Sequence, residues 1–349
     1  MNNIDNKILI VFDTAFGSTN IGDEIIMEAI NNELNNLIKK PFIFNQRIAT
    51  HTSIPKEQKH FLKYAKIALI GGTNLFRLNY RPFDYKRNPW KINFMNSLLL
   101  RNVVFFGVGT TIRRSISRKI TSKLKGYFYH KYSIYQWKKI LSKDTYHSVR
   151  DNETLNMLKD IGIENVINTG CPSIWKLDLD HCEHIPQKKS KDVVVTISNS
   201  KSKNIALHYL RIVTKAYDNV YLWPQSIEDY PYITQMLKEI GNKIKIIPST
   251  LNAYDHLLTN NNSIDYVGTR LHGGIRAIQH KKRSIIIAVD SRALSFKRDF
   301  NLPVIDKNEI KNLSEIINSN IKINININND KINMFKKNLQ KKIYNLFNL

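Results

Sequence analysis

Short runs of Val, Ile and other apolar residues alternate along the chain with longer segments in which apolar residues recur every three to four positions. The short runs are continuous, which is typical of parallel strands that helices cover on both faces. They predict strands in two sets, at 7–12, 66–70, 103–106, 145–149 and 164–168, and then at 192–197, 219–223, 243–247, 264–267 and 284–289. The pattern therefore predicts an α/β protein built on two parallel sheets.

The segments between the strands carry helix signals. From Ile21 to Ile38, apolar residues recur on one face of a 3.6-residue period. Asp151 stands where it can cap the helix that follows it. The amphipathic segment that begins at Ile227 reaches Gly241, the residue type expected just past a helix.

The two sets of strands predict two domains, which fits a chain of 349 residues at about 150 residues per domain. We expect Rossmann-like domains at 1–180 and 188–320, joined by the polar, Pro-containing segment 178–190. A terminal helix is expected within 321–349. It would pack against the domains or, alternatively, lie on a membrane through one apolar side made of Ile332, Phe335, Leu339, Ile343 and Phe347.

The charge is strongly unbalanced. Lys and Arg number 53 against 29 Asp and Glu, a net charge of +24, which predicts attraction to a polyanion. From 85 to 143 there are 14 Lys and Arg, interleaved with aromatic residues, and no acidic residue. This basic region predicts contact with an anionic membrane surface. The alternative is a basic face that contacts only solvent. Replacing Arg113, Arg114, Arg118 and Lys119 by Glu distinguishes the two interpretations, because only a membrane contact predicts that this change removes vesicle binding.

Other classes of partner and location are less favoured. No nucleic-acid-binding signature accompanies the charge, so no nucleic-acid partner is expected. No run approaches the roughly 20 apolar residues that span a bilayer, and the first residues do not resemble a signal peptide. Cys171 and Cys182 have neither zinc-site nor redox-motif spacing. We expect a cytoplasmic protein that can attach to the inner face of the cytoplasmic membrane.

Several small-residue turns follow predicted strands, where ligands bind in open parallel sheets. The segment FDTAFGSTNIGDE leads from a strand into a helix, so Asn20 and Asp23 can either cap that helix or reach a ligand. Gly71, Gly72 and Gly107 lie in two further turns, where glycine allows the backbone to approach a ligand.

The segment TRLHGGIRAI is the most distinctive of these turns. Arg270 and His272 lie two residues apart at the expected start of a helix, whose positive end favours a neutral imidazole and attracts an anion. Leu271 and Gly273 complete the turn. Arg150 also follows a strand and opens a helix, and it can either bind an anion or form a salt bridge with Asp151 or Glu153.

The order of these motifs resembles the polysaccharide pyruvyl transferase family. The matching segments are NIGDE at 20–24, GGTNLF at 71–76, GVG at 107–109, SVRDNETLNMLKDIG at 148–162, TRLHGGIRAI at 269–278 and AVDSRALSFKRDFNLP at 288–303. The resemblance spans 8–305. It implies two facing Rossmann-type domains, as in GT-B-like enzymes, and transfer of pyruvate from phosphoenolpyruvate onto a sugar as a cyclic ketal.

Residue roles follow from the same resemblance, which carries functional positions over to Arg150, Arg270, Leu271 and His272. Phosphoenolpyruvate has a carboxylate and a phosphate, which suits Arg150 and Arg270 as an anion clamp. His272 would be the general acid and base, and Asp23 or Glu24 would deprotonate the acceptor. The chain departs from the family pattern at Thr73 and in CPSIW at 171–175, which leaves the acceptor sugar open.

From this resemblance, the donor, the acceptor and the cofactors can also be predicted. Phosphoenolpyruvate is the donor, the acceptor is a lipid-linked or polymeric glycan, and no metal or further cofactor is expected because no metal-ligand spacing occurs. Two alternatives stay open: a GT-B glycosyltransferase that uses a nucleotide sugar, and a non-catalytic module that binds an anionic glycan. As an exposed cleft residue, Arg270 is expected to tolerate replacement by alanine without loss of folding.

Overall fold

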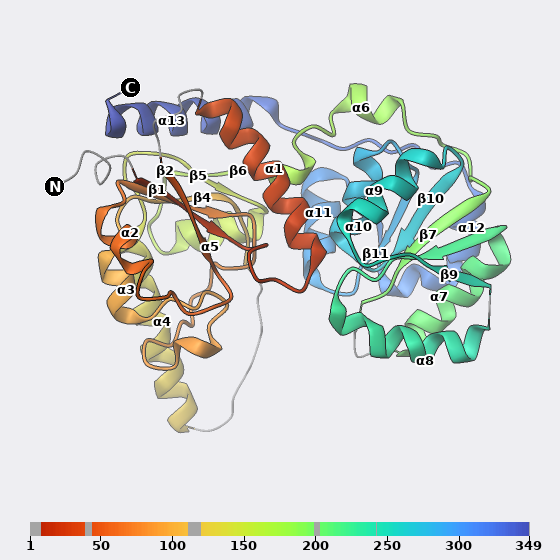
Figure 1. The fold of residues 1–349 in the computed structure, drawn as a ribbon, viewed down its shortest axis with the longest axis horizontal. Helices are drawn as coiled ribbons and strands as arrows, with labels where there is room; N and C mark the ends of the chain where they lie inside the picture. Colours follow the sequence, from red (N-terminus) through yellow and green to blue (C-terminus); the bar gives the residue numbers. More distant parts are fainter. Residues whose placement is uncertain (1–7, 39–43, 111–119, 199–202, 242, 349) are drawn as a thin grey trace. The chain divides into compact units, whose positions relative to one another are not determined.

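The computed structural model describes residues 8–38, 44–110, 120–198, 203–241 and 243–348, which form two compact units (Figure 1). Unit 1 contains 8–18, 26–172 and 328–348 of these residues, and unit 2 contains 19–25 and 173–327. Each unit holds one six-stranded sheet whose strands all run parallel. The α/β class and the two parallel sheets predicted from the hydrophobic pattern are confirmed.

The sheet of unit 1 has the strand order β2-β1-β3-β4-β5-β6. Its strands are β1 (Ile8–Asp13), β2 (Phe44–Ala49), β3 (Ile67–Gly71), β4 (Val103–Val108), β5 (His147–Val149) and β6 (Val166–Asn168). Its helices are α1 (Ile21–Leu37, whose first residues up to Ile25 are grouped with unit 2), α2 (Lys59–Tyr64), α3 (Phe94–Leu99), α4 (Ile120–Ile140), α5 (Asn152–Asp160) and α13 (Asn329–Phe347), with a short 3-10 helix, η2 (Tyr85–Arg87).

Helices cover both faces of this sheet, which explains the continuous apolar runs. Successive side chains of a strand point to opposite faces. In β4, the Phe105 ring packs 5.3 Å from Trp137 of α4, whereas the Phe106 ring lies 5.1 Å from Phe335 of α13. Figure 1 shows α13 along one side of the sheet and α2, α3 and α4 on the other.

The sheet of unit 2 has the order β12-β11-β10-β7-β8-β9, which is the order of dinucleotide-binding Rossmann sheets. Its strands are β7 (Asp192–Thr196), β8 (Asn219–Leu222), β9 (Ile244–Ile246), β10 (Ile264–Gly268), β11 (Ser284–Ile287) and β12 (Val304–Ile305). Its helices are η3 (Pro172–Ile174, which begins at the last residue of unit 1), α6 (Leu179–Glu183), α7 (Lys203–Ala216), η4 (Ile227–Asp229), α8 (Tyr230–Ile240), α9 (Leu251–Asn260), α10 (Leu271–Gln279), α11 (Ser291–Phe300), η5 (Lys307–Asn312) and α12 (Leu313–Asn318).

The local helix signals are confirmed. The Asp151 carboxylate accepts a hydrogen bond from the Thr154 N–H at 2.8 Å and so caps α5. Gly241 follows α8 with a φ of 82°, a left-handed conformation that favours glycine. The five apolar residues of the terminal segment are all buried in α13, which packs as part of unit 1.

The unit boundaries differ from those expected from composition. The division falls between Pro172 and Ser173, and the segment 178–190, expected to be a linker, contains α6 and buries Cys182 and Ile185. The terminal helix belongs to unit 1 rather than forming a separate segment. The expected membrane test residues Arg113, Arg114, Arg118 and Lys119 lie outside the described residues.

His147 in β5 predicts a pH dependence of the stability of unit 1. Its ring is fully buried: Nδ1 accepts from the Phe105 N–H and Nε2 donates to the Ser142 carbonyl, and this burial lowers the pKa of His147 to about 4. The unfolded chain titrates near pH 6.5, so it binds more protons than the folded chain between these two values. The stabilisation is therefore fully present above about pH 6.5, and about 3 kcal/mol of it is lost as the pH falls towards 4.

The check is urea unfolding of the wild type and of His147→Gln at several pH values. Glutamine can keep one donor and one acceptor but does not titrate in this range. The free energy of unfolding should fall more steeply in the wild type between pH 6.5 and 4.5. Parallel curves for the two proteins would show that His147 is not the group responsible.

Candidate functional site

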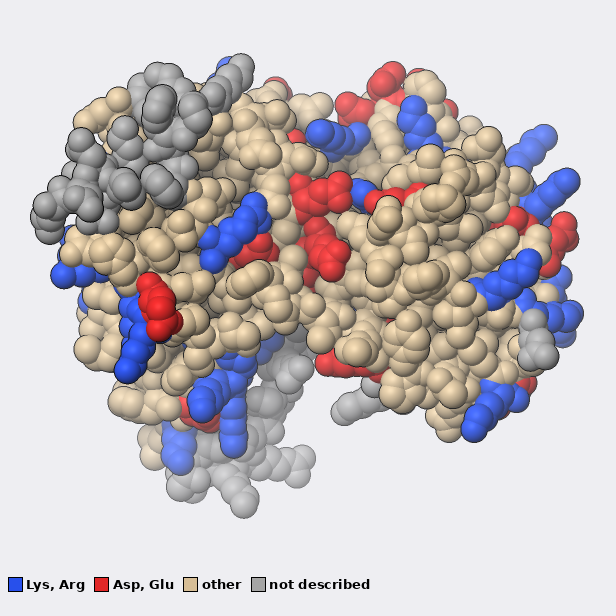
Figure 2. Space-filling model, viewed as in Figure 1, with Lys and Arg blue, Asp and Glu red and all other residues tan. Residues whose placement is uncertain are grey.

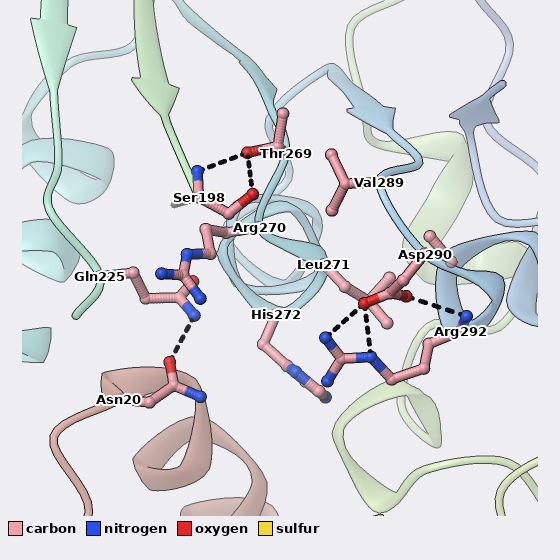
Figure 3. Close-up of a pocket in the computed structure, with 11 residues that line it drawn as sticks. Asn20, Ser198, Gln225, Thr269, Arg270, Leu271, His272, Val289, Asp290 and Arg292 are labelled. Carbon is pink, nitrogen blue, oxygen red and sulfur yellow. Dashed lines mark hydrogen bonds and ion pairs between the residues drawn. The ribbon is translucent and has the colours of Figure 1, made fainter. Parts of the chain in front are cut away.

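A pocket opens at the carboxyl edge of the unit 2 sheet (Figure 3). Ser198 follows β7 and Thr269 follows β10, and these two strands pair in the middle of the sheet, where the strand order reverses. Open α/β sheets bind ligands at such a switch point. The pocket is lined by Asn20, Ser198, Gln225, Thr269, Arg270, Leu271, His272, Val289, Asp290, Arg292 and Ala293.

A closed ring of hydrogen bonds fixes the backbone where α10 begins. The Arg270 N–H donates to Thr196 Oγ1 at 3.2 Å, and the Tyr266 hydroxyl donates to the Arg270 carbonyl at 2.6 Å. The two hydroxyls lie 2.6 Å apart, so Thr196 donates to Tyr266. Burial raises the pKa of Tyr266 well above its ordinary value, which keeps its hydroxyl protonated and able to donate. Arg270, the N-cap residue of α10, is thereby held rigidly at the pocket.

Three glycines allow α10 and β10 to approach their neighbours. A Cβ at Gly268 would lie 2.3 Å from Thr196 Oγ1, and one at Gly274 would lie 2.4 Å from Ile286 Cγ1. A Cβ at Gly273 would lie 3.0 Å from Gln225 Oε1. The glycines of this segment therefore let the start of the helix pack directly on the sheet and on the Gln225 side chain.

The packing at Gly274 predicts a loss of stability on substitution. Gly274→Ala should destabilise the protein by about 1–3 kcal/mol, because the new methyl group overlaps Ile286 and Tyr266 and this overpacking exceeds the gain in helix propensity. Gly126→Ala is the matched control: that glycine lies in α4 with no neighbour within 4 Å, and alanine should stabilise there by about 0.5–1 kcal/mol. Thermal unfolding measures both, and equal shifts would contradict the close approach.

Arg270 extends from this fixed point and is only partly exposed. Its side chain is 20% exposed, and it forms an ion pair with the wholly buried carboxylate of Asp229. Among the described residues, its Nε is a buried donor without a hydrogen-bond partner. The guanidinium is therefore anchored on one side and retains a donor to which an anionic ligand could bind.

A second arginine lines the pocket from the start of α11. Asp290 caps that helix by accepting from the Arg292 N–H at 2.9 Å. The same carboxylate accepts from Arg292 Nε at 2.8 Å and Nη2 at 2.5 Å. The Arg292 side chain is 39% exposed. Two helix N-termini and two guanidinium groups therefore border one pocket, a combination that favours an anion.

Asn20 is tied to this pocket through Gln225. Gln225 Nε2 donates to Asn20 Oδ1 at 2.9 Å across 205 residues of sequence, and the Ile21 N–H donates to the Gln225 carbonyl. A Cβ at Gly22 would lie 2.6 Å from Gln225 Nε2. The amide of Gln225 thus fits between Gly22 and Gly273, and it connects the NIGDE and RLHGG motifs.

His272 lies in the first turn of α10, is 8% exposed and lines the pocket (Figure 3). Leu271 lines it as well, at 9% exposure. The structure therefore brings together four of the residues singled out in the sequence, Asn20, Arg270, Leu271 and His272, with Gly273 packed behind them.

Asp23 and Glu24 lie in the first turn of α1, three and four residues after Asn20 in the sequence. Asp23 is half-buried and already engaged in interactions. Burial and the neighbouring Asp23 carboxylate raise the pKa of Glu24. Either carboxyl group is a chemically suitable base, and that role stays a prediction.

The other predicted site residues belong to unit 1. Arg150 is 2% exposed, and its guanidinium lies 3.2 Å from the Asp151 carboxylate, so the salt bridge considered from the sequence is present. It also fills the space beside Gly109, where a Cβ would come within 2.3 Å of the guanidinium. Its part in an anion clamp stays a prediction.

The glycines of unit 1 have packing functions. A Cβ at Gly71 would lie 2.7 Å from Met27 Sδ, and one at Gly72 would lie 2.7 Å from Ile26 Cγ2, so both let α1 pack closely on β3. Gly107 has a φ of 73° and packs against Pro172. These contacts are with the protein itself, and ligand binding at the three positions stays a prediction.

Sequence reasoning missed Gln225, Asp229 and Arg292. Gln225 and Asp229 follow β8 in WPQSIED, where Ser226 and Asp229 form a capping box. Such a Ser-x-x-Asp spacing after a strand was a usable signal for a helix start at the sheet edge. Arg292 lies in the AVDSRALS segment, and nothing in that segment alone distinguishes it from other surface arginines.

Comparison with known protein families gives a match. The sequence profile described as polysaccharide pyruvyl transferase matches residues 20–291. The comparison with curated proteins gives no match.

Solved structures resemble the chain only distantly. UDP-GlcNAc 2-epimerase from Neisseria meningitidis is 13% identical over 97% of this chain and 99% of its own, with a TM-score of 0.48. The wall teichoic acid polymerase TagF is 13% identical over 100% of this chain and 85% of its own, with a TM-score of 0.42. The E. coli heptosyltransferase WaaC is 8% identical over 80% and 88%, with a TM-score of 0.32.

Proposed function

Because the chain belongs to the polysaccharide pyruvyl transferase family, we propose that it transfers pyruvate from phosphoenolpyruvate to a sugar of a polysaccharide, or of its lipid-linked precursor, as a cyclic ketal. The observation that carries this proposal is the pocket of unit 2, where Arg270 and Arg292 border His272. The donor has one carboxylate and one phosphate, and each planar or tetrahedral oxyanion is a good partner for a guanidinium group.

The two arginines have different parts in this proposal. Arg270 is preorganised by its backbone ring and by Asp229, so it binds one oxyanion without losing much conformational entropy. Arg292 is half-exposed at the N-terminus of α11 and binds the second oxyanion, for which it must share or exchange its contact with Asp290. Arg150, buried beside Asp151 in unit 1, is kept as a further candidate that variants must test.

His272 supplies and removes protons in the proposed reaction. Protonation of the donor methylene carbon turns it into a methyl group and leaves a cationic centre at the neighbouring carbon. One sugar hydroxyl attacks that carbon, the carbon–oxygen bond to phosphate breaks, and a second hydroxyl closes the ketal. Of the two hydroxyl protons, one ends on the methyl group and the other on the released phosphate, so the reaction is balanced. An imidazole at the pocket can carry out such transfers near neutral pH.

The experiment is incubation of the purified protein with phosphoenolpyruvate and a panel of soluble and lipid-linked sugars that carry vicinal or 4,6-type hydroxyl pairs. Release of inorganic phosphate together with a pyruvyl ketal on the acceptor, detected by mass spectrometry, supports the proposal. Phosphate release without acceptor modification, or consumption of a nucleotide sugar instead, overturns it. Arg270→Lys serves as the inactive control, because it retains the positive charge but loses the planar set of N–H donors.

A further inference from the structure

Helix α4 of unit 1 is buried on one side, whereas its opposite side is apolar and exposed. Ser133, Gln136, Trp137 and Ile140 recur at helical spacing and are buried against the sheet. The opposite side is exposed and is formed by Leu124, Tyr127, Phe128 and Tyr135, with exposed fractions of 68%, 64%, 50% and 57%. These positions are separated by three, one and seven residues, so they form a single stripe along the helix.

The neighbouring helix also exposes apolar side chains. Helix α3 packs against α4, where the Phe94 ring lies 6.1 Å from Tyr132. On its outer side α3 exposes Met95 and Leu99, at 68% and 38%. Figure 1 shows α4 extending beyond the other helices of unit 1. We call the exposed side chains of α3 and α4 named here, together with Lys125, Lys131, Lys138 and Lys139, the α3–α4 surface.

The charged residues of the α3–α4 surface are all cationic. Lys125, Lys131, Lys138 and Lys139 are exposed on α4, and the sequence has no Asp or Glu from 85 to 143. The Lys131 ammonium lies 5.5 Å from the centre of the Tyr127 ring, and that of Lys139 lies 5.9 Å from the Tyr135 ring. Figure 2 shows Lys and Arg side chains, with acidic side chains beside them, over the lower part of unit 1.

We propose that the α3–α4 surface docks on an anionic lipid bilayer. Aromatic rings and aliphatic side chains insert at the headgroup boundary, and lysines beside them contact the lipid phosphates. No helix within the described residues is long and apolar enough to cross a membrane. The surface goes beyond the proposed reaction, because it belongs to unit 1 and none of its residues lines the unit 2 pocket.

Two other occupants fit the surface less well. A second copy of the chain would bring the same lysines face to face, and like charges repel. A nucleic acid would attract the lysines and stack on the tyrosines, but Met95, Leu99 and Leu124 would gain nothing from phosphates or bases. Only a bilayer interface uses the cations, the aromatic rings and the aliphatic side chains together.

The experiment is co-sedimentation of the full chain with vesicles of phosphatidylcholine alone and with vesicles that also contain phosphatidylglycerol. We expect binding only to the anionic vesicles and release at high ionic strength. Lys125→Glu with Lys131→Glu should weaken binding by at least about 25-fold, since each cation near an anionic surface contributes about fivefold. Leu124→Ser with Phe128→Ser should weaken it by about tenfold or more.

Matched controls use exposed residues of unit 2 and α13. Lys188→Glu with Lys322→Glu changes the same charge, and Leu179→Ser with Met334→Ser removes comparable apolar side chains. Both controls should bind vesicles as the wild type does, and all four variants should keep the wild-type melting temperature.

Each remaining outcome overturns the proposal. If the wild-type protein does not bind anionic vesicles, the α3–α4 surface is not a docking site. The same conclusion follows if the surface variants bind these vesicles as the wild type does. If the protein binds a nucleic acid duplex, and the lysine variant loses this binding while the Leu124/Phe128 variant keeps it, the surface binds nucleic acid instead. A concentration-dependent dimer in analytical ultracentrifugation that the Leu124/Phe128 variant abolishes identifies self-association.

Discussion

Arg270→Lys is expected to weaken phosphoenolpyruvate binding by about 10- to 100-fold and to abolish turnover, while the protein keeps nearly its wild-type stability. Lysine retains a cation for the buried Asp229 carboxylate, so the fold does not acquire an unpaired charge. It loses the planar fork of N–H donors, including the Nε donor that has no protein partner within the described residues. Hydrogen bonds to charged groups contribute about 1.5–3 kcal/mol, which sets the expected loss of affinity.

Arg270→Ala is expected to behave differently, and here the structure corrects the expectation drawn from the sequence. The alanine variant leaves the wholly buried Asp229 without its guanidinium partner. Removal of one partner of a buried ion pair costs about 3–5 kcal/mol, so this variant should be clearly destabilised and not nearly neutral. Adding Asp229→Asn removes the unpaired charge and should recover most of the stability without recovering binding.

Two measurements separate these effects. Isothermal titration calorimetry gives the affinity for phosphoenolpyruvate, and urea unfolding without ligand gives the free energy of unfolding. If Arg270→Lys binds the donor as tightly as the wild type does, Arg270 is not part of the anion site. Arg270→Ala with wild-type stability shows that the Asp229 ion pair is not needed for the fold.

His272→Asn is expected to lower kcat by about two to four orders of magnitude with little change in donor affinity. A positioned general acid and base contributes a factor of this size, and asparagine fills a similar volume without titrating near neutral pH. His272 is nearly buried at the pocket, whereas in the proposed reaction Arg270 and Arg292 hold the donor. Single-turnover kinetics measures the chemical step directly.

His280→Asn is the matched control for this variant. His280 follows the last residue of the same helix and pairs with Asp255, so its loss affects α10 without affecting the pocket. It should keep near wild-type kcat. A His272 variant with unchanged kcat and a raised KM would make His272 a binding residue, and the proton donor would then be another group.

The family match and the fold differ in what they contribute to these proposals. The profile covers most of the chain, from 20 to 291, and includes both the NIGDE and RLHGG motifs. The solved structures are at most 13% identical among those compared above and carry no argument about substrate. The roles of Arg270, Arg292 and His272 therefore depend on the pocket and on the variants proposed for it.

The hydrophobic pattern predicted ten of the twelve described strands, including the edge strands β6 and β9, and missed the edge strands β2 and β12. Inner strands are buried on both faces, so they read as continuous Val and Ile runs, and β1, β3, β4, β7, β10 and β11 lie where the pattern predicts them. β2, with the sequence FNQRIA, pairs only with β1, and the two-residue β12 pairs only with β11. Asn45 and Arg47 of β2 are exposed polar residues, and β12 is too short to form a recognisable run, so neither strand shows the apolar pattern on which the prediction depended.

The sequence by itself determined the α/β class, the buried strands, the caps of α5 and α8 and the local RLHGG turn, because each depends on residues close together in the chain. Only the tertiary structure decided that Gln225 joins Asn20 across 205 residues and that Asp229 anchors Arg270 across 41. It also decided that α4 buries Trp137 and exposes Leu124 and Phe128. Large apolar side chains occur on both sides of α4, so only the packing of the rest of unit 1 determines which side is covered.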